Sequence, residues 1–244
     1  NPGADRVTLN GANLILSGSG MATIKVSRDI PIIGSSIATE NGHLILEANQ
    51  QTTPTSGLFD GIGVSAGEIK VTGTGTLTAT GRGGDASVGS GRGIHVSSGG
   101  KITGGSGMVT VNGTGGASVG NNNIGVLVIT SSITSSGGAV SVTGQGGGSG
   151  TSGGNVGVAV SSAGQITAGG SGTVTVNGTG GAGTGNNNHG VSVRDANSRI
   201  TSSSGAVSVT GTGTNGANDI LMASGGAVTS TSTTAGITLN STTN

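Results

Sequence analysis

Paired carboxylates could do chemistry here, because two Asp or Glu side chains about 5 to 9.5 Å apart can cleave glycosidic bonds. The 244-residue chain has nine acidic residues. On the layered fold inferred below, Asp29 and Asp219 are equivalent positions about six layers, or ~29 Å, apart, which is too far for a catalytic pair. Asp29 and Asp60 fall on adjacent layers and could approach closely, but an Asp beside a strand start is more often a turn residue. Phe59, the single aromatic residue, cannot by itself line a sugar cleft. A polysaccharide-acting β-helix enzyme is therefore the least favoured function.

The densest polar group beyond residue 102 contains His189, Arg194, Asp195 and Arg199. A group of this kind could bind an anion or another ligand. The alternative is a solvated loop with local ion pairs, which contribute little at exposed sites. We favour the solvated loop.

Metal ligands and cofactor motifs are sparse. His43 and His95 have no partner at the spacing of metal ligands, and the chain has no Cys. Calcium-binding nonapeptide repeats need an Asp in every turn, whereas the turn at Gly81–Asp85 is isolated, so calcium at a loop is kept only as an alternative. The Gly-x-Gly strings open no helix and lack the Lys of a phosphate loop. We expect no catalytic residue, no metal site and no cofactor.

Composition excludes several classes of protein. Charged residues make up 7% of the chain and cancel to a net charge of zero, and 55 residues are Gly. Nucleic acid is not an expected partner, because no basic patch interleaves with aromatic residues. Membrane insertion is not expected, because the apolar runs are far shorter than the ~20 residues that a spanning helix needs. The absence of Cys is compatible with secretion.

Three columns of apolar residues recur about every 32 residues. The elements that these residues form must position any functional site. One column is Leu14/Leu16, Leu44/Leu46, Leu77/Ala79, Val109/Val111, Val140/Val142, Val174/Val176, Val207/Val209 and Ile237/Leu239. A second column is Val7, Ile37, Ile69, Ile102, Ile133, Ile166, Ile200 and Val228. A third column is Ile30/Ile32, Ile62/Val64, Ile94/Val96, Val126/Val128, Val158/Val160, Val191/Val193 and Ile220/Met222. Each repeat therefore contains three short segments with the alternation of a β-strand.

This pattern predicts an all-β protein, a parallel β-solenoid or β-helix of seven to eight coils with three short strands per coil. We expect a right-handed coil. Residues 1–244 form one domain, in which 1–29 make a partial, more irregular first coil and 30–244 make the regular coils. One coil buries too few apolar side chains to fold alone, so neighbouring coils must stack.

Stacking predicts ladders of like residues along the axis. The expected ladders are Ile102, Ile133, Ile166 and Ile200; Thr103, Thr134, Thr167 and Thr201; and Asn123, Asn155 and Asn188. Glu68 precedes its strand as Lys101 does one coil later, which predicts an ion pair between the two coils. The segments that follow the Val-x-Val strands vary most and should protrude as loops.

An outward array of small polar residues is the candidate binding surface. It consists of Thr78, Thr110, Ser141, Thr175, Ser208 and Thr238, with a second polar column two residues further along each strand. Flat Thr arrays of this kind resemble ice-binding β-solenoids, which makes ice binding an alternative function. A hydroxyl ladder that stabilises the stack and keeps the rod soluble is the interpretation we favour.

The repeat at residues 157–188 reads Gly-Val-x-Val, Ile-Thr, and then Val-x-Val-x-Gly-Thr-Gly-Gly ending in Asn-Asn-Asn. This pattern resembles filamentous-hemagglutinin-like exoproteins and related β-strand-repeat adhesins of bacterial surfaces. The resemblance implies a secreted or cell-surface β-helix that acts in attachment or matrix building. Repeats of about 32 residues are longer than the coils of the best-known hemagglutinin rods, so the subfamily stays open.

A structural role is the expected function. We expect a segment or subunit of an extracellular fibre or cell-surface adhesin, without catalysis, that associates end to end or continues a longer rod. Both ends should present unpaired strand edges, because neither shows a cap of charge, Pro or helix. A surface glycan is a second candidate partner. Fourteen of the eighteen charged residues lie in the first 102, which indicates a distinct surface near that end.

Overall fold

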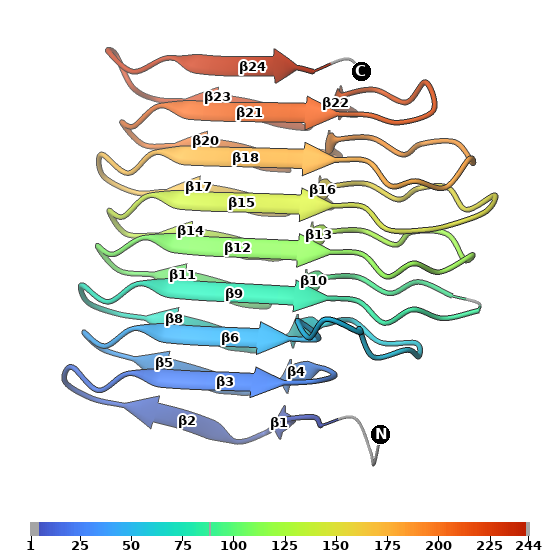
Figure 1. Ribbon diagram of the computed structural model, residues 1–244. Coiled ribbons are helices and arrows are strands. Elements are labelled where there is room, and N and C mark those ends of the chain that lie inside the picture. Colours follow the sequence, from blue (N-terminus) through green and yellow to red (C-terminus); the bar gives the residue numbers. More distant parts are fainter. Residues whose placement is uncertain (1–4, 88, 243–244) are drawn as a thin grey trace.

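The computed structural model describes residues 5–87 and 89–242, and within them the chain forms strands and no helix. Three parallel sheets of eight strands each enclose a narrow core (Figure 1). Sheet A contains β1 (Leu9–Asn10), β4 (Ile30–Ile33), β7 (Ile62–Ser65), β10 (Ile94–Ser97), β13 (Val126–Ile129), β16 (Val158–Ser161), β19 (Val191–Arg194) and β22 (Ile220–Ala223). Sheet B contains β2 (Asn13–Leu16), β5 (Ser36–Thr39), β8 (Glu68–Val71), β11 (Lys101–Gly104), β14 (Ser132–Ser135), β17 (Gln165–Ala168), β20 (Arg199–Ser202) and β23 (Ala227–Ser230). Sheet C contains β3 (Ala22–Val26), β6 (Leu44–Ala48), β9 (Leu77–Arg82), β12 (Val109–Thr114), β15 (Val140–Gln145), β18 (Val174–Thr179), β21 (Val207–Thr212) and β24 (Ile237–Ser241).

The expected β-solenoid is confirmed. In Figure 1 the strands of sheet C lie in front and run from left to right, the chain returns behind them, and successive turns rise towards the C-terminus. That path is a right-handed coil. Each strand between the first and the last of its sheet pairs in parallel with the strand one turn before it and the strand one turn after it.

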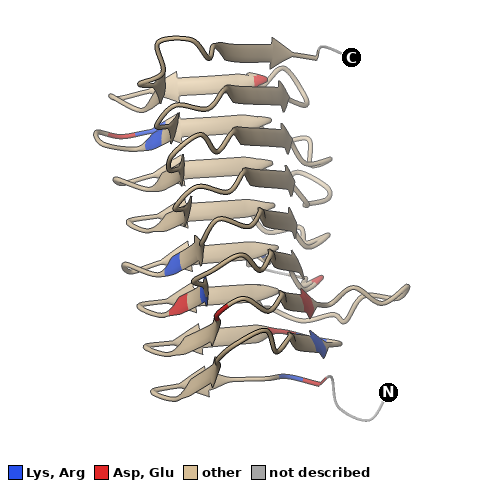
Figure 2. Ribbon diagram, turned by 90° about the vertical axis from the view of Figure 1, so that its left-hand side faces the viewer, with Lys and Arg blue, Asp and Glu red and all other residues tan. Residues whose placement is uncertain are grey.

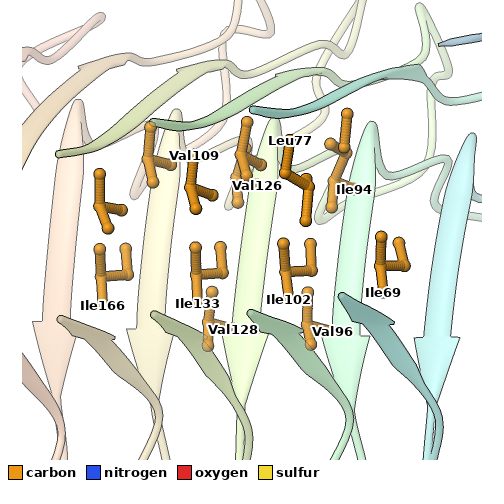
Figure 3. Packing of buried hydrophobic residues seen from close by; sticks show 14 of the residues in the cluster. Ile69, Leu77, Ile94, Val96, Ile102, Val109, Val126, Val128, Ile133 and Ile166 are labelled. Carbon is orange, nitrogen blue, oxygen red and sulfur yellow. The ribbon is translucent and has the colours of Figure 1, made fainter. Parts of the chain in front are cut away.

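Like residues superpose between layers. Ile102 is the strand partner of Ile69 and of Ile133, and Ile133 is the partner of Ile166. The four side chains lie in a row along the axis, one from each layer (Figure 3), and none is exposed. Inward residues alternate with half-buried outward ones along the strands, so each layer covers the apolar side chains of the next.

The first turn differs from the expected alignment. Leu14 pairs with Ile37 in sheet B, and it therefore does not belong to the Val-x-Val column. The Val7 amide donates to the carbonyl of Asp29, which places Val7 beside the start of β4 and not in the second column. Sheet C begins instead with β3, in which Ile24 pairs with Leu46. Residues in the first turn lie 22 or 23 positions before their strand partners, because this turn lacks a long loop. The sequence alignment assumed a constant repeat of about 32 residues and therefore assigned Leu14 and Val7 to the wrong columns.

Glycine shapes the corners where sheet B passes into sheet C. A Cβ on Gly138 would lie 1.9 Å from the carbonyl oxygen of Gly107 in the preceding layer, so no larger residue fits without a backbone shift. A Cβ on the adjacent Gly137 would meet nothing within 4 Å. Close stacking of the backbone therefore requires Gly at one position of this turn and not at its neighbour.

The longer loops run from sheet C to the next strand of sheet A and protrude to the right in Figure 1. They fold back onto the outer face of sheet A. Ile124 and Val156 come from these loops and form a second apolar cluster with Leu127 and Ala159 of that face. Where the first loops cover sheet A less completely, a hollow remains near the N-terminal end.

Candidate functional site

The small polar array lies on the outer face of sheet C. Successive strand partners are Thr78, Thr110, Ser141, Thr175, Ser208 and Thr238. Parallel pairing sets neighbouring members about 4.8 Å apart. The first five are half-buried and Thr238 is exposed. This arrangement makes a regular hydroxyl surface, and its use in ice binding stays a prediction.

The Thr column of sheet B forms hydroxyl pairs. Thr103, Thr134, Thr167 and Thr201 are successive strand partners. The Thr167 hydroxyl donates to Thr134 Oγ1 at 2.8 Å, and the Thr103 hydroxyl donates to Glu68 at 2.9 Å. The hydroxyls therefore bond locally, within pairs of layers.

The Asn column secures the long loops. Asn123, Asn155 and Asn188 are completely buried. Asn155 Oδ1 accepts from the backbone amide of Asn123 at 3.0 Å and from its Nδ2 at 3.1 Å. Asn188 Oδ1 accepts from the backbone amide of Asn155 at 3.0 Å. A buried amide that bonds to its counterpart in the next layer holds a loop in register, so these residues have a structural role.

The prediction that Glu68 forms an ion pair with Lys101 is wrong, because Glu68 lies beside a different lysine. Glu68 and Lys101 are strand partners, as expected. The Glu68 carboxylate, however, turns towards Lys70, with an Nζ–Oε2 distance of 3.9 Å, and accepts from Thr103. Glu68 and Lys70 are two residues apart on one strand and share its outer face, which brings their side chains together.

The four polar residues between positions 189 and 199 do not form one site. They make no ion pair with one another, so the expected local ion pairs are wrong. The Asp195 carboxylate instead accepts from the Ser162 amide at 3.1 Å. His189 is buried under the loops, and its Nδ1 accepts from the Asn218 amide at 3.0 Å. Burial, with the positive charge of Arg194 nearby, lowers the pKa of His189 below its ordinary value.

Most charged residues belong to the N-terminal layers (Figure 2). A hollow opens on the outer face of sheet A in the same layers. We call this cavity of about 390 Å³ the N-terminal hollow. It is lined by residues of β4, β7 and β10, by residues 58–60 of the loop before β7, and by Arg6 and Asp29. Gly63 is an outward residue of β7, between Pro31 and His95 of the neighbouring strands. Gly63 has no side chain, so the sheet surface is open at this point.

Asp60 and His95 form the polar wall of the hollow. His95 Nδ1 lies 2.8 Å from Asp60 Oδ2, and the Arg92 amide donates to Asp60 Oδ1 at 2.9 Å. The Arg92 guanidinium lies 3.5 Å from the same carboxylate. Burial by itself would raise the pKa of Asp60, but the hydrogen bond from His95 and the charge of Arg92 outweigh it and leave the pKa below its ordinary value. Asp60 is therefore a carboxylate at neutral pH.

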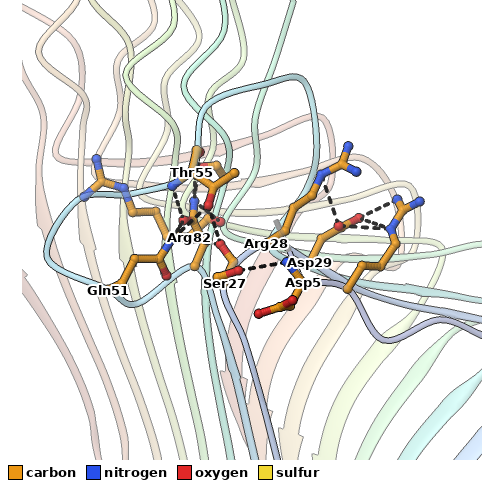
Figure 4. A network of polar contacts seen from close by, with 10 residues as sticks. Asp5, Ser27, Arg28, Asp29, Gln51, Thr55 and Arg82 are labelled. Carbon is orange, nitrogen blue, oxygen red and sulfur yellow. Dashed lines mark hydrogen bonds and ion pairs between the residues drawn. The ribbon is translucent and has the colours of Figure 1, made fainter. Parts of the chain in front are cut away.

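Asp29 is buried at the N-terminal side of the hollow. Arg6 donates to it through Nε at 3.0 Å and through Nη2 at 2.6 Å, and Arg28 Nε lies 3.5 Å away (Figure 4). The Arg28 guanidinium also stacks over Phe59, 5.2 Å from the ring centroid. Asp29 and Asp60 are thus each neutralised by their own cations, unlike a catalytic acid and base that must exchange protons.

A buried amide positions the loop that carries Leu58 and Phe59. Asn49 adopts a left-handed backbone with φ of 59°, and its Oδ1 accepts from the Thr55 amide at 2.7 Å. The Thr55 hydroxyl and Gln51 Nε2 both donate to the Ser27 carbonyl (Figure 4). These contacts hold the loop against the first turn, so the hollow has a fixed wall.

Sequence reasoning missed the meeting of Asp60 and His95. The two residues are 35 positions apart, one repeat of about 32 residues plus three. That offset and the Gly at position 63 between Pro31 and His95 were the available signals. A search for metal-ligand spacing did not reveal them, because the partner of His95 is a single carboxylate.

In the described part of the chain, no group of three or more His, Cys, Asp and Glu could hold a metal ion. Asp85, in the turn considered for calcium, accepts from the Ala117 amide at 2.6 Å and lies 3.6 Å from Arg82. Residues 5–87 and 89–242 contain no helix with the length and apolar character needed to cross a membrane.

Comparison with known proteins identifies no relative: no family model, no curated protein and no solved structure matches this chain. Function must therefore be argued from the β-solenoid and its surfaces.

Proposed function

We propose that this chain is a structural, non-catalytic segment or subunit of an extracellular fibre or cell-surface adhesin, built by continued stacking of β-solenoid layers. The observation that carries the proposal is the exposure of the core columns at the end layers. Ile237 of β24 is 44% exposed, whereas its partner Val207 in β21 is completely buried. At the other end, Leu14 of β2 is 39% exposed, whereas its partner Ile37 in β5 is completely buried.

An exposed edge strand in a parallel sheet presents unpaired amide and carbonyl groups. Here the edge also carries apolar residues in the register of the interior columns, since Ile237 and Leu239 continue Val207 and Val209. A further β-solenoid layer would satisfy both the hydrogen bonds and the apolar surface, so it is the occupant that fits this edge. Contacts of this head-to-tail kind build filaments.

Low charge, the absence of Cys and the resemblance of the repeats to bacterial surface proteins support the extracellular setting. The engagement of Asp29 and Asp60 by Arg and His side chains supports a role without catalysis. A rigid rod with in-register sheets suits scaffolding, because its length grows by about 4.8 Å with each layer.

Assembly is tested by electron microscopy and X-ray fibre diffraction on the purified 244-residue chain. We expect filaments with a meridional repeat of about 4.8 Å. The double variant Ile237→Lys, Leu239→Lys should remain as single short rods, because two ammonium groups would lie in the stacking surface.

The matched control is Thr238→Lys, Asn240→Lys, which places the same charges on the outer face of the same strand. This variant should still form filaments. Monodisperse short rods from the unaltered chain, or equal behaviour of the two double variants, would contradict assembly through the layer edges.

A further inference from the structure

One column of residues is Gly in the interior layers and charged in the end layers. Each member immediately precedes the first backbone-paired residue of sheet A in its layer. Every member after the first accepts, through its carbonyl, the same backbone bond from the layer before: Val7 donates to Asp29, and Val191 donates to Asp219. We call this set the corner column; in order it is Arg6, Asp29, Gly61, Gly93, Gly125, Gly157, Gly190 and Asp219.

Backbone contact excludes side chains from the interior part of the corner column. A Cβ on Gly93 would lie 2.2 Å from the amide nitrogen of Thr114, and a Cβ on Gly190 would lie 2.3 Å from that of Thr212. The three charged members lie instead in the first two layers and in the last layer. Charge in this column is therefore a feature of the two ends of the rod.

Arg6 and Asp29 show how charges of adjacent layers meet in this column. Arg6 donates to the Asp29 carboxylate through Nε at 3.0 Å and through Nη2 at 2.6 Å. Within residues 5–87 and 89–242, Nη1 of Arg6 has no hydrogen-bond partner, and the side chain is 46% exposed. A guanidinium has donors for two carboxylates, so Arg6 can bind a second one from a layer on its open side.

Asp219 supplies a carboxylate at the opposite end of the rod. Its Oδ1 accepts from the Gly213 amide at 2.6 Å, and its Oδ2 accepts from the Ser241 hydroxyl. These two bonds lower the pKa of Asp219, so the side chain is ionised at neutral pH. In the described part of the chain, no Lys, Arg or His forms an ion pair with it. Asp219 and Arg6 are thus complementary charges at equivalent positions of the two end layers.

The strand register predicts what meets if the first layer of a second copy stacks on the last layer of this one. Apolar residues then face apolar residues in all three sheets: Ile220 and Val7, Met222 and Leu9, Val228 and Leu14, Ile237 and Ala22, and Leu239 and Ile24. In this register Arg6 lies one layer beyond Asp219. A second copy rotated by one sheet would instead bring Ala12 or Met21, the residues before β2 and β3, to that place.

We propose that a second copy of this chain docks on the C-terminal layer with its sheet A continuing sheet A, and that Asp219 of one copy binds Arg6 of the next. Arg6 then lies between two carboxylates, Asp219 on one side and Asp29 on the other. This inference rests on the proposed function: layer stacking drives the association, and the ion pair selects one of the three rotations that a three-sided rod permits.

Cross-linking tests the rotation, because the chain has no Cys of its own. The variant Thr23→Cys, Thr238→Cys carries thiols on the outer faces of β3 and β24, which the proposed docking makes strand partners about 4.8 Å apart. The variant Ile15→Cys, Thr238→Cys is the matched comparison, since its thiols meet only if sheet B docks on sheet C. After treatment with dibromobimane, which joins neighbouring thiols, the first variant should form covalent ladders on denaturing gels and the second should stay monomeric.

Asp219→Asn tests the ion pair. Asn keeps an acceptor for the Gly213 amide and removes the charge. We expect the lowest concentration at which filaments form to rise about threefold or more at low salt, and the difference to shrink at high salt. The control is Asp195→Asn, which removes a carboxylate of the preceding layer that likewise accepts from a backbone amide, that of Ser162. This control should leave the concentration unchanged.

Cross-links in the Ile15→Cys variant or in neither variant would overturn the inference, as would equal assembly of Asp219→Asn and the unaltered chain. Filaments would still form in those cases, so the proposed structural function would stand without this register. Absence of filaments from the unaltered chain would overturn the proposed function and the inference together.

Discussion

His189 illustrates how the neighbouring layers decide the chemistry of a single side chain. It occupies the position that Ile124 and Val156 hold in the two preceding layers, beneath a protruding loop. The Asn218 amide donates to its Nδ1, and Arg194 places a positive charge nearby. Both burial and that charge disfavour protonation, so the pKa of His189 is lowered in the folded protein.

A lowered pKa makes stability depend on pH with a definite sign. Below about pH 6.5 the unfolded chain binds a proton at His189 before the folded chain does. The free energy of unfolding should therefore fall as the pH drops from about 6.5 towards the folded pKa. Urea unfolding at pH 7.5 and at lower pH measures this slope, and the variant His189→Val, which restores the residue type of the earlier layers, should show a smaller one. Equal slopes for the two proteins would contradict the assignment.

The turns and strands of each coil depend on backbone contact between layers. Strands pair through backbone hydrogen bonds in unbroken register, and the corners between sheets B and C bring backbone carbonyls against Cα atoms. At such a corner a side chain larger than that of Gly would clash with a backbone carbonyl of the preceding layer, so one residue decides how closely two layers can stack. The large Gly content thus has a packing cause, in addition to any effect on flexibility.

Substitutions at the adjacent glycines Gly138 and Gly137 separate these two causes. Gly138→Ala should reduce the free energy of unfolding by about 1 to 3 kcal/mol, because the methyl group meets the Gly107 carbonyl and the backbone must shift. Gly137→Ala should be neutral or stabilising by up to about 1 kcal/mol, because its Cβ meets nothing and the unfolded chain loses entropy. Chemical denaturation of both variants tests the difference. Equal effects of the two would count against backbone contact as the reason for Gly at this corner.

The rod as a unit behaves as a stack of nearest-neighbour layers. Interior layers share strand register, loop connection and core column, so each contacts equivalent partners above and below. Stability in such a stack is a sum over layers and the interfaces between them. A complete layer should therefore be removable, although part of a layer should not.

Deletion of residues 126–157 joins Gly125 to Val158 and removes one complete turn, since Val126 and Val158 are strand partners. We expect a folded rod about 4.8 Å shorter, with a lower free energy of unfolding. Deletion of residues 126–141 removes half a turn and brings strands of different sheets into line, so this chain should not fold. Circular dichroism and small-angle X-ray scattering compare the two. Failure of both deletions to fold would contradict independent stacking of layers.

Periodicity in the sequence was enough to determine the solenoid, its three sheets and the pairing of most strands. The information is redundant, because β-branched residues alternate in each strand and recur one turn later, as at Ile102, Ile133 and Ile166. A shift of one residue would move an entire apolar column to the surface. The strand register is therefore constrained in every layer, and it can be read from the spacing of the apolar residues alone.

The tertiary structure decided the features that depend on loop path and side-chain direction. The short first turn places Leu14 in sheet B and Val7 beside the start of β4, because strand pairing follows the chain's path and not a constant repeat length. Asp60 and His95 meet across two layers because a loop brings them to the same outer face, and Glu68 turns to Lys70 although its strand partner is Lys101. Periodicity specifies where the backbone of each layer lies, whereas contacts between polar side chains are selected by local geometry and by the charges that the fold happens to bring near.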